Sequence, residues 1–260
     1  MENSKENNWK TKDLGEGYML RYRDDPSLEF ITGATNISVA VKDQCQFSCR
    51  TCYSKSLHKG EYNVDPLAYQ KLLELTMAVK VGLTFGEPTL HPQLDELVGM
   101  TIEQRINLEV DTNGVDIKKL AHLIYRFRDN SLYLDVRLSI DADHEEQHSL
   151  RGSDLIETAK QLRTWAKHHN NDLYFTWRRL NEKDDFVERA TSALGIDMPT
   201  FMGIDDTEPW YLQGSEDNLR HFQRPVPDHI YFGLDGYLYD NNFDFNRANV
   251  ENAIGQIVKR

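Results

Sequence analysis

The stretch that decides the fold reads Leu-Tyr-Leu-Asp-Val-Arg-Leu-Ser-Ile over residues 132–140. Apolar residues occupy every second position, and polar residues, two of them charged, occupy the positions between. Successive side chains of a β-strand point to opposite faces, so this stretch predicts a strand with one apolar face and one polar face. The same alternation recurs at 106–113 and 173–178, which indicates several such strands in one sheet.

Strands and helices alternate along the chain from residue 36 onward. Strands are predicted at 36–42, 80–85, 106–112, 132–140, 172–178 and near 200–204, and helices near 65–78, 92–104, 116–128, 153–169 and 183–194. Six β/α units in series predict a parallel sheet. The predicted fold class is α/β, a partial (β/α)6 TIM-like barrel. Because apolar and polar residues alternate along the strands, we expect helices on the apolar face of the sheet and a lumen along its polar face.

Shorter elements are predicted on both sides of the barrel. Residues 18–23 and 28–32 predict an N-terminal β-hairpin, and residues 229–240 predict a second hairpin that turns at Asp235-Gly236. We therefore expect three parts, which are an N-terminal extension and hairpin at 1–35, the barrel at 36–215 and a small C-terminal cap at 216–260.

Length and composition limit the classes of protein. With 260 residues, of which 39% are hydrophobic and 28% charged, the chain can bury the core of one barrel. A formal net charge of −12 argues against a sequence-independent grip on nucleic acid, because the phosphates would be repelled. No apolar run approaches the length of a membrane span, and the first residues lack the apolar stretch of a secretion signal. We expect a protein of the reducing cytoplasm.

The three cysteines of the chain, Cys45, Cys49 and Cys52, all lie within eight residues. They follow the strand predicted at 36–42. A fully cysteine-ligated zinc or iron site needs four thiolates, whereas three suit a cluster that keeps one iron open to a ligand. The alternatives are a zinc site that recruits an outside ligand such as His58, and three buried free cysteines.

Further motifs follow the cysteine loop in a fixed order. Cys-x3-Cys-x2-Cys with Tyr53 after it resembles the cluster loop of the radical S-adenosylmethionine (radical SAM) superfamily. Gly86-Glu87-Pro88 resembles the Gly-Gly-Glu-Pro motif of that family, and Thr112-Asn113-Gly114 resembles its Thr-Asn-Gly motif. The stretch from Ser139-Ile-Asp141 to His148-Ser-Leu-Arg151-Gly152 is similar to the MoaA/SPASM-like branch, whose members modify peptides and metabolites.

The resemblance implies two cofactors, a [4Fe–4S] cluster and S-adenosylmethionine (SAM). Cys45, Cys49 and Cys52 would ligate three irons, and the fourth iron would bind the amino and carboxylate groups of SAM. One electron into the sulfonium would give a 5′-deoxyadenosyl radical, which abstracts hydrogen from the substrate or adds to it. A reducing partner such as flavodoxin or ferredoxin would supply the electron.

The resemblance also implies which residues contact SAM. Gly86 and Glu87 would receive the methionine ammonium, and Arg151 would take the methionine carboxylate. The remaining cofactor-binding candidates are Asn113 and Ser139 near the ribose or carboxylate, Thr51 and Tyr53 near the adenine, and Phe85, which stands where the family has glycine.

Each of these residues also has a purely structural interpretation. Glu87 before Pro88 is typical of a helix start, and Asn113-Gly114 is typical of a tight turn. Arg151 could instead pair on the surface with Glu145 or Glu146 and contribute little.

The polar strand faces are expected to line the lumen with charge. If Asn113 and Ser139 point inward, as the family match implies, period two points the charged residues of the same strands inward as well. Buried charges need partners, so these residues pair either with each other or with a substrate. Pairing with each other would only hold the barrel closed. The substrate-binding candidates are Glu109, Asp111, Asp135, Arg137 and Arg178. We expect a polar small-molecule substrate, and the alternatives are a peptide-modifying enzyme and a non-catalytic relative that binds the cluster or SAM.

The C-terminal hairpin resembles that of an auxiliary-cluster domain but lacks its metal ligands. Asp240 stands where a cysteine would be, and no cysteine follows Cys52. We therefore expect a SPASM-like cap without a cluster. An enzyme with no auxiliary cluster to accept an electron favours redox-neutral outcomes such as epimerisation, rearrangement or elimination.

Overall fold

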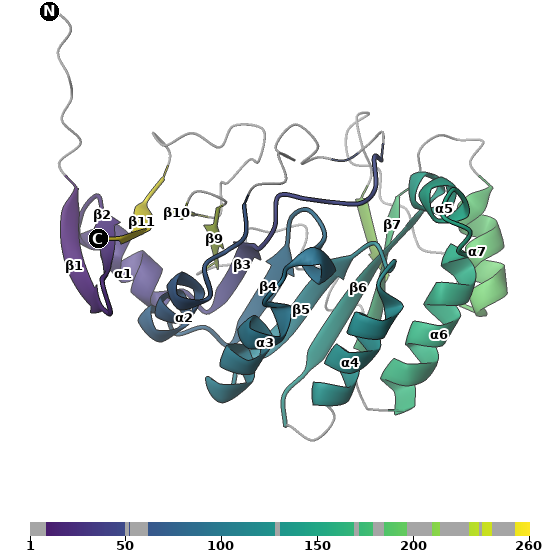
Figure 1. The fold of residues 1–260 in the computed structure, drawn as a ribbon, viewed down its shortest axis with the longest axis horizontal. Helices are drawn as coiled ribbons and strands as arrows, with labels where there is room; N and C mark the ends of the chain where they lie inside the picture. The colour runs from purple at the N-terminus through teal and green to yellow at the C-terminus, as the bar shows by residue number, and fades with distance from the viewer. Residues whose placement is uncertain are drawn as a thin grey trace, which may run out of the picture.

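The computed structural model describes residues 9–49, 52, 62–127, 131–168, 172–178, 185–196, 210–213, 229–233, 236–240 and 253–260, with backbone alone at 172–178 and 210–213. The described strands form one sheet in the order β1-β2-β11-β10-β9-β3-β4-β5-β6-β7-β8. Figure 1 shows this sheet running the length of the molecule, with β1 at one end and the strands around β7 towards the other. The sheet does not close on itself.

The centre of the sheet is parallel. In chain order it contains β3 (Asn36–Ala40), β4 (Lys80–Thr84), β5 (Asn107–Thr112), β6 (Leu134–Asp141) and β7 (Asp172–Arg178). Each of these strands pairs in parallel with the next. These strands confirm the predicted β/α pattern, and the fold is the predicted open, TIM-like partial barrel. The strand predicted near 200–204 lies outside the described residues.

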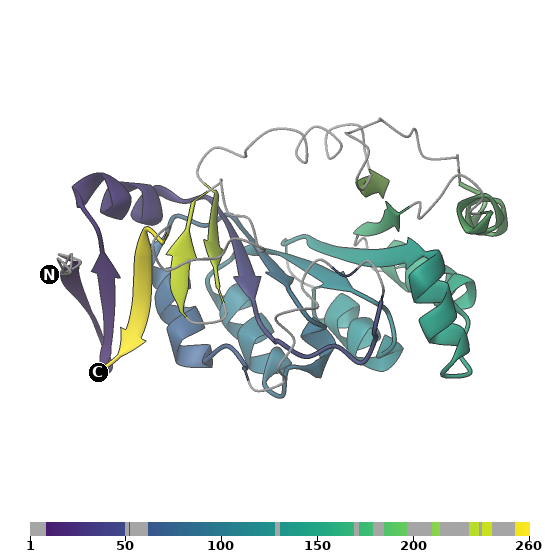
Figure 2. The same cartoon turned by 90° about the horizontal axis from the view of Figure 1, so that it is seen from above.

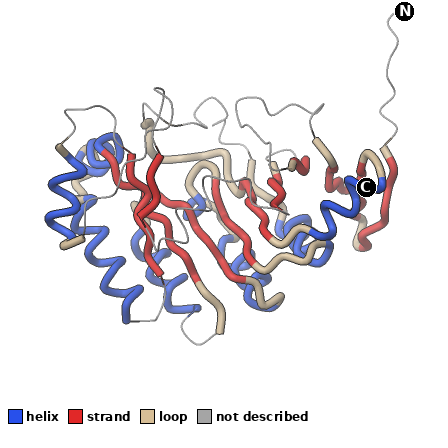
Figure 3. The backbone as a smooth tube through the Cα atoms, turned by 180° about the vertical axis from the view of Figure 1, so that it is seen from behind, coloured by secondary structure: helices blue, strands red, loops and turns tan. Residues whose placement is uncertain are grey.

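Helices cover one face of this sheet. They are α2 (Pro66–Leu75), α3 (Leu94–Glu103), α4 (Ile117–Phe127) and α6 (Leu155–His168). They lie on the same side of the strands in Figures 1 and 2, and Figure 3 shows the strands from the opposite side with these helices behind them. We call the sheet face turned away from these helices the inner face.

The alternation of β6 explains why the sheet has two different faces. Leu134, Val136, Leu138 and Ile140 are fully buried, whereas the alternate residues Asp135, Arg137 and Ser139 are partly exposed. Burying such side chains against helices is worth about 1.5–3 kcal/mol each. The apolar half of each strand therefore builds the core, and the polar half is left on the inner face.

The N-terminal hairpin forms earlier in the chain than expected. It consists of β1 (Lys10–Gly15) and β2 (Tyr18–Tyr22). The predicted second strand at 28–32 is wrong, because these residues belong to helix α1 (Asp25–Gly33). The Asp24 side chain accepts a hydrogen bond from Ser27 N at 2.8 Å, and Pro26 lies in the first turn, so the cap starts a helix at this point.

The C-terminal strands join the same sheet. The predicted hairpin is present as β9 (His229–Phe232) and β10 (Tyr237–Tyr239), paired antiparallel. β9 also pairs in parallel with β3, and β11 (Gly255–Lys259) lies between β10 and β2. The division into three parts at residues 35 and 215 stays a prediction, but strands from both ends of the chain extend the barrel sheet.

The remaining described elements lie after β4 and around β6 and β7. They are the short 3-10 helix η2 (Pro88–Leu90), α5 (Ala142–Ser149), α7 (Phe186–Leu194) and β8 (Trp210–Gln213), which pairs antiparallel with β7. Among the described residues, no helix is long and apolar enough to span a membrane.

Candidate active site at the strand ends

The predicted motifs meet at the carboxyl ends of the parallel strands. Cys45 and Cys49 follow β3, Glu87 follows β4, Asn113 follows β5, and Asp141 ends β6. The carboxyl ends of parallel strands lie along one edge of a sheet, which is where barrel enzymes place their active sites. We call the site made by these residues and their hydrogen-bond partners the rim. Cys49 is buried, and Cys45 and Cys52 are half-buried.

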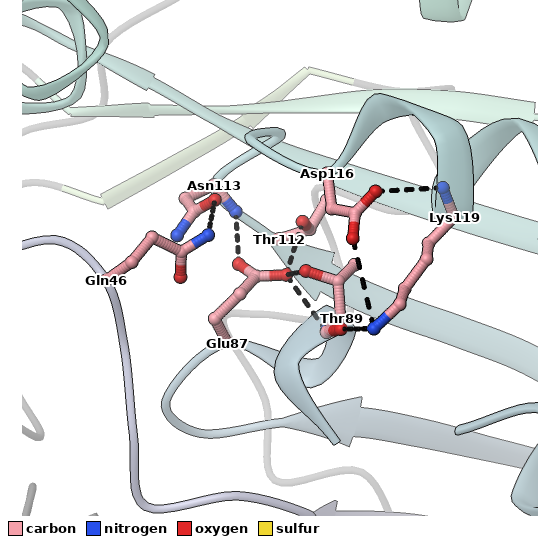
Figure 4. Close-up of polar contacts among 7 residues, drawn as sticks. All are labelled: Gln46, Glu87, Thr89, Thr112, Asn113, Asp116 and Lys119. Atoms are coloured by element: carbon pink, nitrogen blue, oxygen red, sulfur yellow. Dashed lines mark hydrogen bonds and ion pairs between the residues drawn. The ribbon is translucent and has the colours of Figure 1, made fainter. Parts of the chain in front are cut away.

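The Glu87 carboxylate is fully engaged inside the protein. One oxygen accepts from Thr89 N at 3.1 Å, Thr89 Oγ1 at 2.7 Å and Thr112 Oγ1 at 2.8 Å. The other accepts from Asn113 N at 2.8 Å (Figure 4). Burial raises the pKa of Glu87, and the donated hydrogen bonds act to lower it. An ionised carboxylate offers about four lone-pair sites, so these donors satisfy it and tie the end of β4 to the end of β5.

A second contact joins the end of β4 to the cysteine loop. Glu87 N donates to Gln44 O at 2.8 Å, and a Cβ at Gly86 would lie 2.3 Å from Lys42 O and 2.6 Å from Gln44 O. Phe85 and Gly86 both have positive φ, 69° and 62°. The left-handed region favours glycine, which explains why the family motif has glycine at the position of Phe85. Strain of this kind is typical of functional sites.

The sulfur of Cys45 accepts hydrogen bonds from two N–H groups. Phe47 N donates to Cys45 Sγ at 3.4 Å and Asn113 Nδ2 donates at 3.5 Å. Burial raises the pKa of the Cys45 thiol to about 12, although both hydrogen bonds act to lower it. Gln46 Nε2 donates to Asn113 Oδ1 at 3.5 Å, so Asn113 links the end of β5 to the cysteine loop (Figure 4).

Helix α5 packs against the cysteine loop through a histidine that the sequence analysis missed. Asp141 caps α5 and accepts from both His144 N and His144 Nδ1 at 2.8 Å. His144 Nε2 lies 3.9 Å from Cys49 Sγ. Burial acts to lower the pKa of His144, but the charge and hydrogen bond of Asp141, with Cys49, raise that pKa to about 10. The ring also contacts Phe47, with 5.8 Å between centroids.

The end of α5 holds the same loop from a second side. The His148 ring packs edge-on against Phe47 at 5.3 Å, and its Nε2 lies 2.8 Å from Asn113 O. The Arg151 guanidinium lies 5.0 Å from the Phe47 ring centroid and donates to Gln46 O. Of the two surface partners suggested for Arg151, Glu145 or Glu146, Glu145 pairs with Arg189 at 2.9 Å. Arg151 belongs to the rim.

Charged side chains lie on the inner face below the rim. Glu109 Oε2 is 3.0 Å from Lys80 Nζ and 2.5 Å from Arg137. Burial raises the pKa of Asp111 to about 6, while Arg137 acts to lower it and Glu109 to raise it. We call Lys80, Glu109, Asp111 and Arg137 the inner-face cluster. Pairing of the charged residues with each other, one of the two interpretations of the polar strand faces, is present between Arg137 and Glu109. Lys80, which also pairs with Glu109, was not predicted.

Two aromatic rings border this cluster on β9. Ser38 Oγ and His229 Nε2 are 2.9 Å apart, and the His229 ring stacks on Tyr231 with 4.5 Å between centroids. Burial lowers the pKa of His229 to about 4 and raises the pKa of Tyr231. Sequence reasoning placed these residues in a cap, because nothing local signals that β9 pairs with β3.

The other predicted site residues are placed as follows. Ser139 and Asp135 are half-buried on the polar face of β6, and Asp135 is in register with Glu109. Thr51, Tyr53 and the side chain of Arg178 lie outside the described residues. Among the described residues, no group of three or more His, Cys, Asp or Glu side chains is arranged to hold a metal ion by itself.

Comparison with known proteins gives one family. Residues 39–190, more than half of the chain, match the model of the family described as Radical SAM superfamily. A probable GTP 3′,8-cyclase of Pyrococcus abyssi is 24% identical over 186 residues, which are 68% of this chain and 51% of that protein. A putative glycyl-radical enzyme activating enzyme of Methanocaldococcus jannaschii is 33% identical over 79 residues, 29% of this chain and 31% of that protein.

A solved structure shares the fold. It is SuiB of Streptococcus suis bound to S-adenosylmethionine, with a TM-score of 0.52 and 12% identity, over 84% of this chain and 62% of that chain. The chain spans about half, or less, of the length of the curated relatives it matches.

Proposed function

Because the chain belongs to the radical SAM superfamily, we propose that the rim holds a [4Fe–4S] cluster and SAM, and that the enzyme acts on a polar small molecule bound at the inner face. Members of the superfamily are enzymes that use this cluster and SAM, so the family match confirms the predicted family, enzyme class and cofactors.

The residues of the rim fit a cluster held by three thiolates. Cys45, Cys49 and Cys52 are soft sulfur ligands on one short loop, and three of them leave one iron open. Two N–H groups already point at the Cys45 sulfur, from Phe47 and Asn113, and N–H donors at the sulfurs are a usual part of such sites. When bound, the cluster and SAM supply one-electron cleavage of the sulfonium and a hydrogen-abstracting deoxyadenosyl group.

The residues around the loop would orient SAM. We assign the methionine ammonium to the backbone at Gly86, since the Glu87 carboxylate already accepts four hydrogen bonds and positions the strand ends. Arg151, which is exposed and contacts the cysteine loop, would turn its guanidinium to the methionine carboxylate. The other proposed SAM contacts are Thr51, Tyr53, Phe85, Asn113 and Ser139.

The observation that carries the substrate class is the inner-face cluster. Asp111 lies two residues before Asn113 on β5, about 7 Å below the rim at the usual rise per residue. The charged surface extends across three adjacent strands, with Lys80 on β4, Glu109 on β5 and Arg137 on β6. Such a surface suits a substrate with charged or hydrogen-bonding groups. The substrate-binding residues proposed are Glu109, Asp111, Asp135, Arg137 and Arg178.

The names of the relatives support the same class. The Pyrococcus abyssi protein is named for an action on GTP, which is a polar small molecule. The chain spans 51% of that protein, so we carry over only the class of substrate. A flavodoxin or ferredoxin as electron donor, and a cytoplasmic location, belong to the same proposal.

The test is 5′-deoxyadenosine formation by protein reconstituted anaerobically with iron and sulfide and supplied with SAM and dithionite. We expect the product from the unchanged protein and none from Cys49→Ala. A panel of polar metabolites should then contain compounds that raise this rate in the unchanged protein but not in Asp111→Asn. Product that persists in Cys49→Ala, or a rate raised by peptides alone, would contradict the proposal.

A further inference from the structure

His144 is held in one orientation against a proposed cluster ligand. Its Nδ1 lies 2.8 Å from Asp141 Oδ1, its Nε2 lies 3.9 Å from Cys49 Sγ, and its ring packs on Phe47. Asp141 is 3% exposed and also caps the helix that carries His144. The carboxylate therefore fixes both the backbone and the ring of this histidine.

The neighbouring histidine has different partners. His148 packs on the same Phe47 ring, but its nitrogens lie 2.8 Å from Asn113 O and 2.9 Å from Ser153 Oγ. Both are oxygen partners, whereas Nε2 of His144 is directed at sulfur. The chain thus offers two histidines on one helix, four residues apart, of which one faces a cysteine.

We infer that His144 is a positioning residue that donates its Nε2–H to the sulfur of Cys49, orients this ligand and raises the reduction potential of the cluster. The inference rests on the proposed role of Cys49 as a ligand. Asp141 accepts the proton on Nδ1 and a thiolate accepts the one on Nε2, so the ring carries a proton on each nitrogen. Reduction adds negative charge to the cluster, and a donor at a sulfur stabilises that charge.

The test is a redox titration of the reconstituted cluster at fixed pH and without SAM, followed by electron paramagnetic resonance. His144→Phe removes the donor and keeps a ring against Phe47, and His144→Gln restores a neutral donor. We expect a more negative midpoint potential for H144F than for the unchanged protein, and an intermediate value for H144Q. His148→Gln is the matched comparison, because it changes a rim histidine whose ring nitrogens both have oxygen partners rather than a sulfur partner. Its potential should shift by less than that of H144F.

Two results would overturn the inference. One is an equal potential in H144F and the unchanged protein, and the other is a shift in H148Q as large as the shift in H144F. If H144F takes up too little iron for the titration, Asp141→Asn decides, because it keeps a capping oxygen but removes the charge. Its potential should also fall, and an unchanged value overturns the inference. If the unchanged protein forms no [4Fe–4S] signal, the proposed function is overturned as well. If the cluster is normal and its potential is identical in all variants, only the role of His144 is overturned.

Discussion

The rim and the inner-face cluster are both polar, but they hold their side chains in different ways. At the rim, Glu87 is 1% exposed and is bound by backbone and hydroxyl donors, and Gly86 fits against carbonyl oxygens with no room for a Cβ. In the cluster, Glu109 is bound by the ends of two long side chains, Lys80 and Arg137. Backbone contacts fix a position closely, whereas long ion-paired side chains can change partner.

This difference matches the two ligands proposed for the site. A cofactor that is the same in every turnover is served by a rim of fixed geometry. A substrate that must enter and leave is served by charges whose present partners are other side chains. We therefore expect changes at the rim to destabilise the protein by displacing the backbone. Changes in the inner-face cluster should destabilise it by leaving a buried charge without its partner.

The largest effect is expected from Gly86→Ala. Its Cβ would lie 2.3 Å from Lys42 O, so the cysteine loop must move. The matched control is Gly152→Ala, which has a similar positive φ of 69° but nothing within 4 Å of its Cβ. We expect the control to lose about 1 kcal/mol of unfolding free energy in urea. G86A should lose clearly more and also retain less iron after reconstitution, and equal losses would contradict a close-packed rim.

A smaller effect is expected when Arg137 is changed to Met. This variant leaves Lys80 as the one ion-pair partner of Glu109 among the described residues. In such a largely buried position, removing one member of an ion pair costs up to about 3 kcal/mol. Lys80→Met should cost less, because the Lys80 side chain is 33% exposed and that of Arg137 is 12% exposed. Urea unfolding of both variants checks the order, and the reverse order would show that the cluster is not built around the Arg137–Glu109 pair.

The smallest effect is a pH dependence that comes from Asp111. Burial raises the pKa of its carboxyl to about 6 in the folded protein, above the value of about 4 in an unfolded chain. The folded state therefore binds the proton more tightly, and stability from this group is lost as pH rises from about 4 to about 6. Asp111→Asn should flatten that loss by on the order of 1 kcal/mol, measured by urea unfolding at pH 4.5 and pH 7. A curve parallel to that of the unchanged protein would mean that Asp111 titrates normally.

Local pattern was enough to predict the central strands and the four helices that cover them. The alternation at 132–140 became β6, and the buried apolar positions are the ones that the period predicted. The exception at 28–32 shows the limit, because one capping side chain, Asp24, decided between strand and helix. Helix α5 was missed because Ala142–Ser149 has almost no apolar residue to mark a face.

The site was predictable where a motif carries it and not where distant residues complete it. The cysteines, Gly86, Glu87 and Asn113 follow from the family motifs. The partners of Glu87, the contact of His144 with Cys49 and the pairing of Lys80 with Glu109 depend on side chains from separate strands and helices. The sequence of either partner alone contains no signal for such contacts.

The parallel pairing of β9 with β3 has a consequence for the time at which the protein can fold. A ribosome makes β3 about 190 residues before β9, at roughly 5–20 residues per second. Until residues 229–232 emerge, β3 keeps one edge open beside the nascent cysteine loop, and open edges invite pairing with other chains. β2 likewise lacks its β11 neighbour until residues 255–259 are made. Cluster insertion into a finished barrel therefore has to wait until β11 has been made.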